Sequence, residues 1–153
     1  ELQIDEKTIL FIRGVGCIGY PGSAEVVNMQ PPDKLLKEGI SHLPTVGDGR
    51  QSGTSESPSI LNASPESFVG GGLAFLKTGD PVTLNLNNCT LNVEVPIQEW
   101  EARKENWVPP EIENHTPWQE IYRKNVGQLA DGGCLELATA YKKIAKNIPR
   151  DNH

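Results

Sequence analysis

Hydrophobic residues in the first two thirds of the chain occur in short runs that are separated by turn residues. The apolar, β-branched run Thr8–Arg13 predicts a buried strand, and His42–Val46 and Ser59–Asn62 predict two more. The stretch Val82–Val95 alternates apolar and polar side chains on both sides of Asn87-Asn88, which predicts a β-hairpin. This part of the chain is therefore expected to form a strand-rich core.

The pattern becomes helical after residue 96. Ile97–Trp107 is charged and contains neither Gly nor Pro, which predicts a surface helix. Thr116-Pro117 supplies an N-cap followed by proline at the first helical position, and Leu135–Lys146 predicts a final helix with a basic C-terminal end. We expect Trp118 and Tyr122 to anchor these last helices by burying their rings.

Turn residues are frequent along the whole chain. Its 153 residues include 15 Gly and 12 Pro, an excess that favours short strands and loops over a helical bundle. A short helix is predicted over Asp33–Glu38, between Pro32 and Gly39. The pattern predicts one domain with a β-rich α+β fold, barrel-like or sandwich-like, in which residues 1–96 form the core and residues 97–153 a helical extension packed outside it.

Charge and cysteine usage exclude several classes of protein. The net charge is −6, from 14 Lys and Arg against 20 Asp and Glu, which argues against a nucleic-acid or anionic-membrane surface. No run of about 20 apolar residues is present, and we expect neither a membrane span nor a signal peptide. The three cysteines, Cys17, Cys89 and Cys134, lack a C-x-x-C pair, which favours reduced thiols in a cytoplasmic protein.

Two familiar motifs fail on their context. Gly14–Gly19 has the spelling G-x-G-x-x-G of a dinucleotide-binding loop, but Tyr20-Pro21-Gly22 interrupts the helix that must follow. The histidines His42, His115 and His153 have no partner at helical spacing, so a zinc site is not expected.

Two polar residues on glycine-rich loops remain as candidates for chemistry. Glu25 follows the turn Pro21–Ala24, where a carboxylate can bind a hard cation such as magnesium or can simply be an acid in the first turn of a helix. Ser52 lies within Gly49–Thr54, where loop amides can stabilise its alkoxide as a base or nucleophile. It can equally be a turn serine bonded to its own backbone. The pattern leaves both alternatives open for each residue.

Long stretches of the chain resemble a known family. They are GYPGSAEVVNMQPPDKLLKEGI from Gly19, GDGRQSGTSESPSILNASPES from Gly47 and GGGLAFLKTGD from Gly70. They are similar to the C-terminal domain of the dihydroxy-acid and sugar-acid dehydratases, the IlvD/Edd family. The segments TPWQEIYRKNVGQL and PRDNH near the C-terminus resemble the end of the sugar-acid branch. The resemblance covers nearly the whole chain.

The resemblance implies a β-barrel similar to the swivelling domain of aconitase, closing over a larger N-terminal α/β domain. It also implies an enzyme that removes water from a 2,3-dihydroxy acid and yields a 2-keto acid. In the family a serine alkoxide takes the C2 proton, and Ser52 in GRQSGT matches that serine. Glu25 in GYPGSAE matches a glutamate that binds magnesium. Arg50, Thr54 and Ser23 are expected to contact the substrate.

The same resemblance implies magnesium and an iron–sulfur cluster in the full-length enzyme. The family's cluster cysteines and remaining magnesium ligands belong to the N-terminal domain, so we expect this chain alone to hold no cofactor and to be inactive without that domain. Cys17 stands where the family pattern has proline, and Glu56 adds a carboxylate beside the Ser52 loop.

Two other functions stay open at this stage. A stand-alone descendant of the domain would be a cofactor-free cyclase, a pericyclase of the Diels–Alder type or an isomerase, working through a shaped pocket. A non-catalytic binding module would instead dock onto a full-length relative. The expected partners are a small-molecule substrate and the dehydratase N-terminal domain, with a homo-oligomer compatible with either, and neither nucleic acid nor membrane.

Overall fold

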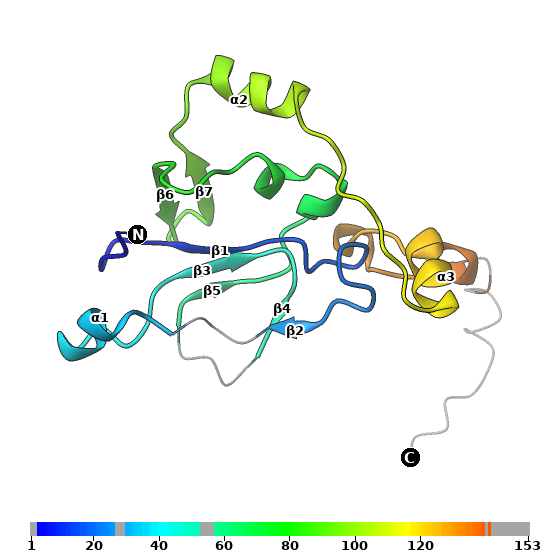
Figure 1. The fold of residues 1–153 in the computed structure, drawn as a ribbon, viewed down its shortest axis with the longest axis horizontal. Helices are drawn as coiled ribbons and strands as arrows, with labels where there is room; N and C mark the ends of the chain where they lie inside the picture. The colour runs from blue at the N-terminus through cyan, green and yellow to red at the C-terminus, as the bar shows by residue number, and fades with distance from the viewer. Residues whose placement is uncertain (1–2, 27–29, 53–56, 140, 142–153) are drawn as a thin grey trace.

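Three short parallel strands form the central sheet of the molecule (Figure 1). The computed structural model describes residues 3–26, 30–52, 57–139 and 141. Strand β3 (Thr45–Gly47) lies between β1 (Leu10–Ile12) and β5 (Ser59–Ile60) and pairs with both in parallel. All three strands lie within or overlap the predicted runs, and β3 is completely buried. The predicted runs therefore formed the central sheet, in which β3 is the inner, buried strand and β1 and β5 are half-buried edge strands.

Two further pairs of strands stand beside this sheet. β2 (Glu25–Val26) pairs in parallel with β4 (Arg50–Gln51), in two segments that the sequence pattern assigned to loops. β6 (Val82–Asn85) and β7 (Thr90–Val93) form the predicted antiparallel hairpin. The hairpin prediction is thus confirmed, and the pairing of β2 with β4 is an addition to it.

The mixed α+β class is confirmed, but the predicted barrel is not. The strands of the described residues form three separate sheets and no closed barrel, and among them β3 alone is paired on both edges. Barrel closure requires every strand to be hydrogen-bonded on both sides with a consistent tilt. Strands of two to four residues, joined by long irregular loops, do not meet that requirement.

The helical elements pack around these sheets. α1 (Asp33–Lys37) occupies the predicted position and buries Leu35, which is 2% exposed. α2 (Ile97–Glu105), also predicted, stands over the β6–β7 hairpin in Figure 1. Trp100 from α2 meets the ring of Phe75 edge-on, with ring centroids 5.7 Å apart. Short 3-10 turns complete this layer: η1 (Ser67–Val69) and η2 (Gly72–Ala74).

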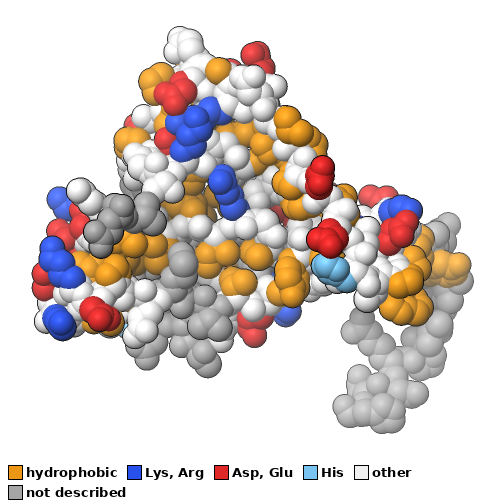
Figure 2. Space-filling view, viewed as in Figure 1, with side chains coloured by type: hydrophobic (Ala, Val, Ile, Leu, Met, Phe, Trp, Pro, Cys, Tyr) orange, Lys and Arg blue, Asp and Glu red, His pale blue; other side chains and the backbone are white. Residues whose placement is uncertain are grey.

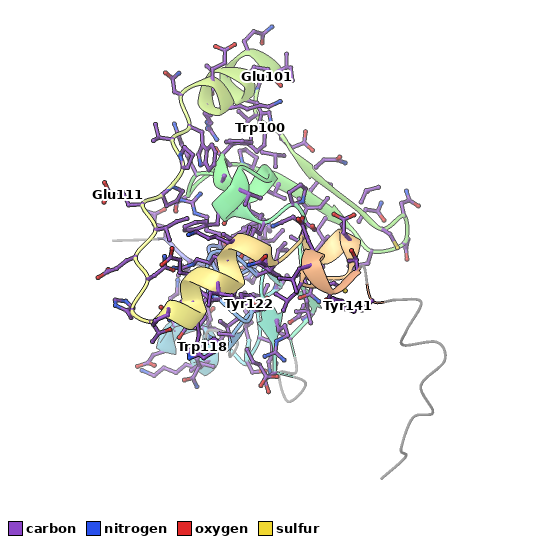
Figure 3. The ribbon with its side chains drawn as sticks, turned by 90° about the vertical axis from the view of Figure 1, so that its right-hand side faces the viewer. Trp100, Glu101, Glu111, Trp118, Tyr122 and Tyr141 are labelled. Atoms are coloured by element: carbon purple, nitrogen blue, oxygen red, sulfur yellow. The ribbon has the colours of Figure 1, made fainter. Side chains whose placement is uncertain are left out.

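α3 (Pro117–Asn125) begins as predicted but is not anchored by its tryptophan. The Thr116 side chain accepts a hydrogen bond from Gln119 N and caps the helix. Trp118 is 78% exposed, so the prediction that it is buried is wrong, whereas Tyr122 is half-buried (Figure 3). Figure 2 shows hydrophobic side chains on the surface at the α3 end of the molecule.

The chain after α3 forms only short elements in the described residues. These are η3 (Leu129–Asp131) and α4 (Glu136–Thr139), and α4 lies within the helix predicted over residues 135–146. Position 140 and residues 142–146 of that prediction lie outside the described residues. Within the described part of the chain, no helix has the length and apolar character needed to span a membrane.

Candidate functional site

The β2–β4 pair brings the predicted site residues into one place. Glu25 lies directly opposite Arg50 in the register, and the amide N of Ser52 donates to the Val26 carbonyl at 3.1 Å. Side chains alternate between the faces of a strand, so Glu25, Arg50 and Ser52 share one face and Gln51 points to the other. Burial agrees, because Glu25 and Arg50 are exposed, Ser52 is half-buried and Gln51 is only 6% exposed.

Arg50 is held by the backbone of the loop that leads into β2. Its Nε donates to the Ser23 carbonyl at 2.7 Å. The Ser23 side chain itself is turned inward: it is 6% exposed and its hydroxyl donates to Cys17 Sγ at 3.2 Å. With a φ of +50°, Ser23 takes the left-handed conformation that this tight turn requires. Ser23 therefore reaches the site through its carbonyl, and Thr54 lies outside the described residues.

Neither of two hollows in the described part of the chain is lined by Glu25, Arg50 or Ser52. One, of about 440 Å³, lies between the ends of α3 and α4 and includes Ile18 and Gln128 in its wall. The other, of about 720 Å³, lies between β1 and the start of β6. A pocket shared by Glu25 and Ser52, which the resemblance implies, therefore stays a prediction.

A fully buried aspartate, which the sequence pattern did not single out, holds two loops together next to β4. Asp48 lies between β3 and β4 and is 0% exposed. Its carboxylate accepts hydrogen bonds from the amides of Gly14 and Val15, at 3.0 and 3.1 Å, and from both the amide and the hydroxyl of Ser67. Four donors satisfy a charge that would otherwise be costly to bury. The available signal was an acid between two glycines directly after an apolar strand.

A second buried acid, Glu66, was also missed. It is 2% exposed and accepts a hydrogen bond from the Ile18 amide at 2.8 Å. Burial raises the pKa of Glu66 above its usual value, and the nearby Asp48 carboxylate adds to the shift. Among the described residues, Glu66 Oε2 and both polar side-chain atoms of Gln51 are buried without a hydrogen-bond partner.

The donor set of the site fits part of a magnesium site. Glu25 offers an exposed carboxylate on the edge of a two-stranded sheet, the kind of hard oxygen ligand that magnesium prefers. No group of three or more His, Cys, Asp or Glu that could hold a metal ion is found among the described residues. Within the described ranges, Glu25 can thus supply one ligand to a magnesium site that is shared with another part of the protein.

An iron–sulfur cluster does not fit this chain. Such clusters are usually held by four cysteine thiolates, whereas the sequence contains three cysteines. Cys17 is buried against Ser23, and Cys89 lies exposed in the turn between β6 and β7. These residues therefore give no basis for a cluster built within the chain.

Comparison with known proteins identifies the family. Residues 1–134 match the family model of the dihydroxy-acid/6-phosphogluconate dehydratase C-terminal region. The chain is 58% identical over 152 residues to a D-xylonate dehydratase of Caulobacter vibrioides, covering 99% of this chain and 26% of that protein. It is 42% identical over 153 residues to an L-arabinonate dehydratase of Rhizobium leguminosarum, covering all of this chain and 26% of that protein.

More distant relatives carry the other activity of the family. A dihydroxy-acid dehydratase of Picrophilus torridus is 33% identical over 135 residues, which cover 88% of this chain and 24% of that protein. The chain thus spans about a quarter of the length of the curated relatives it matches. It belongs to the dihydroxy-acid/6-phosphogluconate dehydratase family and corresponds to the C-terminal region of its members.

Proposed function

We propose that this chain is the C-terminal part of a sugar-acid dehydratase, which removes water from a 2,3-dihydroxy acid and yields the 2-keto acid. The observation that carries the proposal is the 58% identity to a D-xylonate dehydratase along 99% of the chain. An aldonic acid of about five carbons is the substrate class we favour, because the L-arabinonate dehydratase is also a relative of full coverage.

Ser52 is the proposed base. In the reaction its alkoxide takes the proton from C2, and the C–O bond at C3 breaks so that the 3-hydroxyl leaves as hydroxide and is protonated to water. The resulting enol tautomerises to the 2-keto acid. A serine hydroxyl is a poor base in water, so its alkoxide requires stabilisation by loop amides and nearby cations. Arg50, on the same face of β4, supplies one cationic side chain beside it.

Glu25 is the proposed contribution of this chain to magnesium binding. When bound, magnesium would neutralise charge at the carboxylate and 2-hydroxyl end of the substrate. The remaining ligands, and the group that activates the leaving 3-hydroxyl, must come from the rest of a full-length protein, since the relatives are about four times as long as this chain. Glu25 and Arg50 would then close over a substrate held by that larger part.

Substitution in the full-length enzyme tests the proposal. We expect Ser52→Ala to lower kcat for sugar-acid dehydration by about 10² to 10⁴-fold, the usual contribution of a general base, with little change in melting temperature. Glu25→Gln should raise the magnesium concentration needed for half-maximal activity. Titration of magnesium by calorimetry should show the same weakening without turnover.

Matched controls separate site effects from folding effects. Ser59→Ala removes a hydroxyl on β5 that donates to the Ser57 carbonyl, and Glu38→Gln removes an exposed carboxylate at the end of α1. Both controls should keep kcat and magnesium affinity within about twofold of the parent enzyme. Full activity of Ser52→Ala, or the lack of dehydration by the unsubstituted full-length enzyme, would refute the proposed function.

A further inference from the structure

One buried residue outside the proposed reaction site joins distant segments of the chain. Glu66 directly precedes η1, and its Oε1 accepts hydrogen bonds from the Ile18 amide at 2.8 Å and from Gln128 Nε2 at 3.5 Å. Its own amide donates to Gln128 Oε1 at 2.9 Å. Glu66 thereby connects the Gly14–Gly19 loop to the segment that follows α3.

The second oxygen of this carboxyl group lies against the loop backbone. A Cβ atom built on Gly16 would lie 1.6 Å from Glu66 Oε2, so only glycine fits at position 16 while Glu66 keeps its place. Oε2 is buried and has no hydrogen-bond partner within the described ranges. An unpaired buried carboxyl oxygen lowers stability, so filling space does not explain why an acid stands here.

The loop under Glu66 is restrained at both ends. The Asp48 carboxylate binds the amides of Gly14 and Val15, and the Arg123 guanidinium from α3 donates to the carbonyls of Ile18 and Gly19, at 2.8 and 3.3 Å. Glu66 accepts a hydrogen bond from Ile18, whose carbonyl Arg123 also binds, and its Oε2 lies against Gly16 in the middle of the loop. The charges of the Asp48 carboxylate and the Tyr122 phenol interact with this carboxyl group, and Arg123 binds the carbonyl of the same Ile18 whose amide donates to Glu66.

The loop continues directly into the strand that carries Glu25. The amide of Tyr20 donates to the Gly16 carbonyl at 3.0 Å, and the amide of Ser23 donates to the Tyr20 carbonyl at 2.8 Å. Successive turns therefore transmit the position of the loop to β2, whose other restraint is its pairing with β4. A displacement at Gly16 or Ile18 would shift Glu25 relative to Ser52.

We propose that Glu66 is a positioning residue of the dehydratase, which holds the Gly14–Gly19 loop so that Glu25 stays in register beside Ser52. This inference rests on the proposed function. Displacing a reacting group by about 1 Å is enough to slow an enzyme on the order of 100-fold. Gln128 takes part in the same positioning of the loop, because it bonds to both the amide and the carboxyl group of Glu66.

Two substitutions of Glu66 in the full-length enzyme provide the test. Glu66→Ala removes the acceptor of the Ile18 amide, and we expect kcat/KM to fall about 10 to 100-fold. Glu66→Gln keeps an acceptor at the Oε1 position, and we expect it to restore kcat/KM to within about threefold of the parent enzyme. Leu35→Ala is the matched control, because it destabilises a buried position of α1 and should leave kcat/KM within about twofold while the protein is folded.

Amide hydrogen exchange supplies a readout that does not depend on activity. In Glu66→Ala the Ile18 amide should exchange at least about tenfold faster, whereas the amides of the β6–β7 hairpin should be unchanged. Unchanged exchange at Ile18, or equal losses of kcat/KM in Glu66→Ala and Leu35→Ala, would overturn the proposal. If the parent enzyme dehydrates no sugar acid, the proposed function fails, and the exchange at Ile18 still decides whether Glu66 holds the loop.

A second variant covers the case in which Glu66→Ala does not fold. Gln128→Leu leaves the acid in place and removes its amide partner. Faster exchange at Ile18 with a reduced kcat/KM is the expected result, and a variant that is unchanged in both measurements would contradict the inference.

Discussion

Two adjacent glycines illustrate how strongly single positions differ in this chain. A Cβ built on Gly71 would lie 1.7 Å from the Pro65 carbonyl oxygen, and Gly71 is buried. A Cβ on Gly72 would meet nothing within 4 Å, and Gly72 is exposed. The first glycine lets the η1–η2 segment fold back on the Pro65–Glu66 backbone, while the second has no such neighbour.

Alanine should therefore change the free energy of unfolding strongly at position 71 and hardly at all at position 72. Gly71→Ala forces backbone atoms apart, and we expect it to lower the free energy of unfolding by about 2 to 3 kcal/mol, equivalent to a melting temperature lower by about 5 °C or more. Gly72→Ala should change the free energy of unfolding by less than about 0.5 kcal/mol. Thermal unfolding followed by circular dichroism measures both, and equal shifts would show that the close contact at Gly71 is unimportant.

At the scale of elements, one arginine joins α2 to the turn before β6. The Arg103 guanidinium bonds to Asp80 through both terminal nitrogens, at 2.6 and 2.9 Å, and to the Phe75 carbonyl at 3.1 Å. Both side chains of the ion pair are about nine-tenths buried. The hydrogen bonds from Arg103 hold the pKa of Asp80 below its usual value.

This pair predicts a specific response to acid. Because the pKa of Asp80 is lower in the folded chain than in the unfolded chain, its stabilising contribution is present above the usual aspartate pKa and is lost as the pH falls through the folded value. Asp80→Asn should therefore lower the melting temperature at neutral pH but flatten its decline below about pH 4.

The control for this experiment is a second carboxylate–cation pair. Lys124 also lowers the pKa of Glu120 on α3, but both side chains are largely exposed, so Glu120→Gln should leave the melting curve nearly unchanged at any pH. Identical pH profiles for the parent chain and Asp80→Asn would rule out the contribution of the Arg103 pair.

The elements also show what the sequence could and could not predict. Thr116-Pro117 marked the start of α3 because capping is a local interaction, and alternation over Val82–Val95 marked the hairpin for the same reason. β2 and β4 contain two residues each, too few to show alternation, and their pairing joins segments far apart in the chain. The sequence did not predict the roles of Asp48 and Glu66, because their burial depends on irregular loops. Such loops have no periodic pattern of hydrophobic and polar residues.

At the scale of the whole molecule, the chain carries only a share of the proposed reaction site. Glu25, Arg50 and Ser52 are positioned by its own strands, while no group of three or more potential metal ligands is found among the described residues. The part of the chain that the structure describes thus holds the proposed base and the proposed magnesium ligand. A chain with only a share of the site is consistent with its length, because it aligns with about a quarter of each relative.

The isolated chain of 153 residues should accordingly bind no iron–sulfur cluster and dehydrate no sugar acid. Cluster thiolates must lie close together, and no group of three or more potential metal ligands is found in the described part of the chain. Anaerobic purification followed by iron and acid-labile sulfide analysis checks the first expectation, and a keto-acid assay checks the second. Stoichiometric iron and sulfide, or turnover by the chain alone, would contradict them.

The hydrogen bond from Arg123 to the Ile18 carbonyl spans 105 positions of the sequence. A ribosome adding about 5 to 20 residues per second needs roughly 5 to 20 s to make that length of chain. Throughout this interval the Gly14–Gly19 loop lacks its hydrogen bond from Arg123. Contacts of such long sequence separation also slow folding. Nascent chains halted before α3 should therefore be cut by proteases within the Gly14–Gly19 loop, and chains extended past α3 should become resistant there.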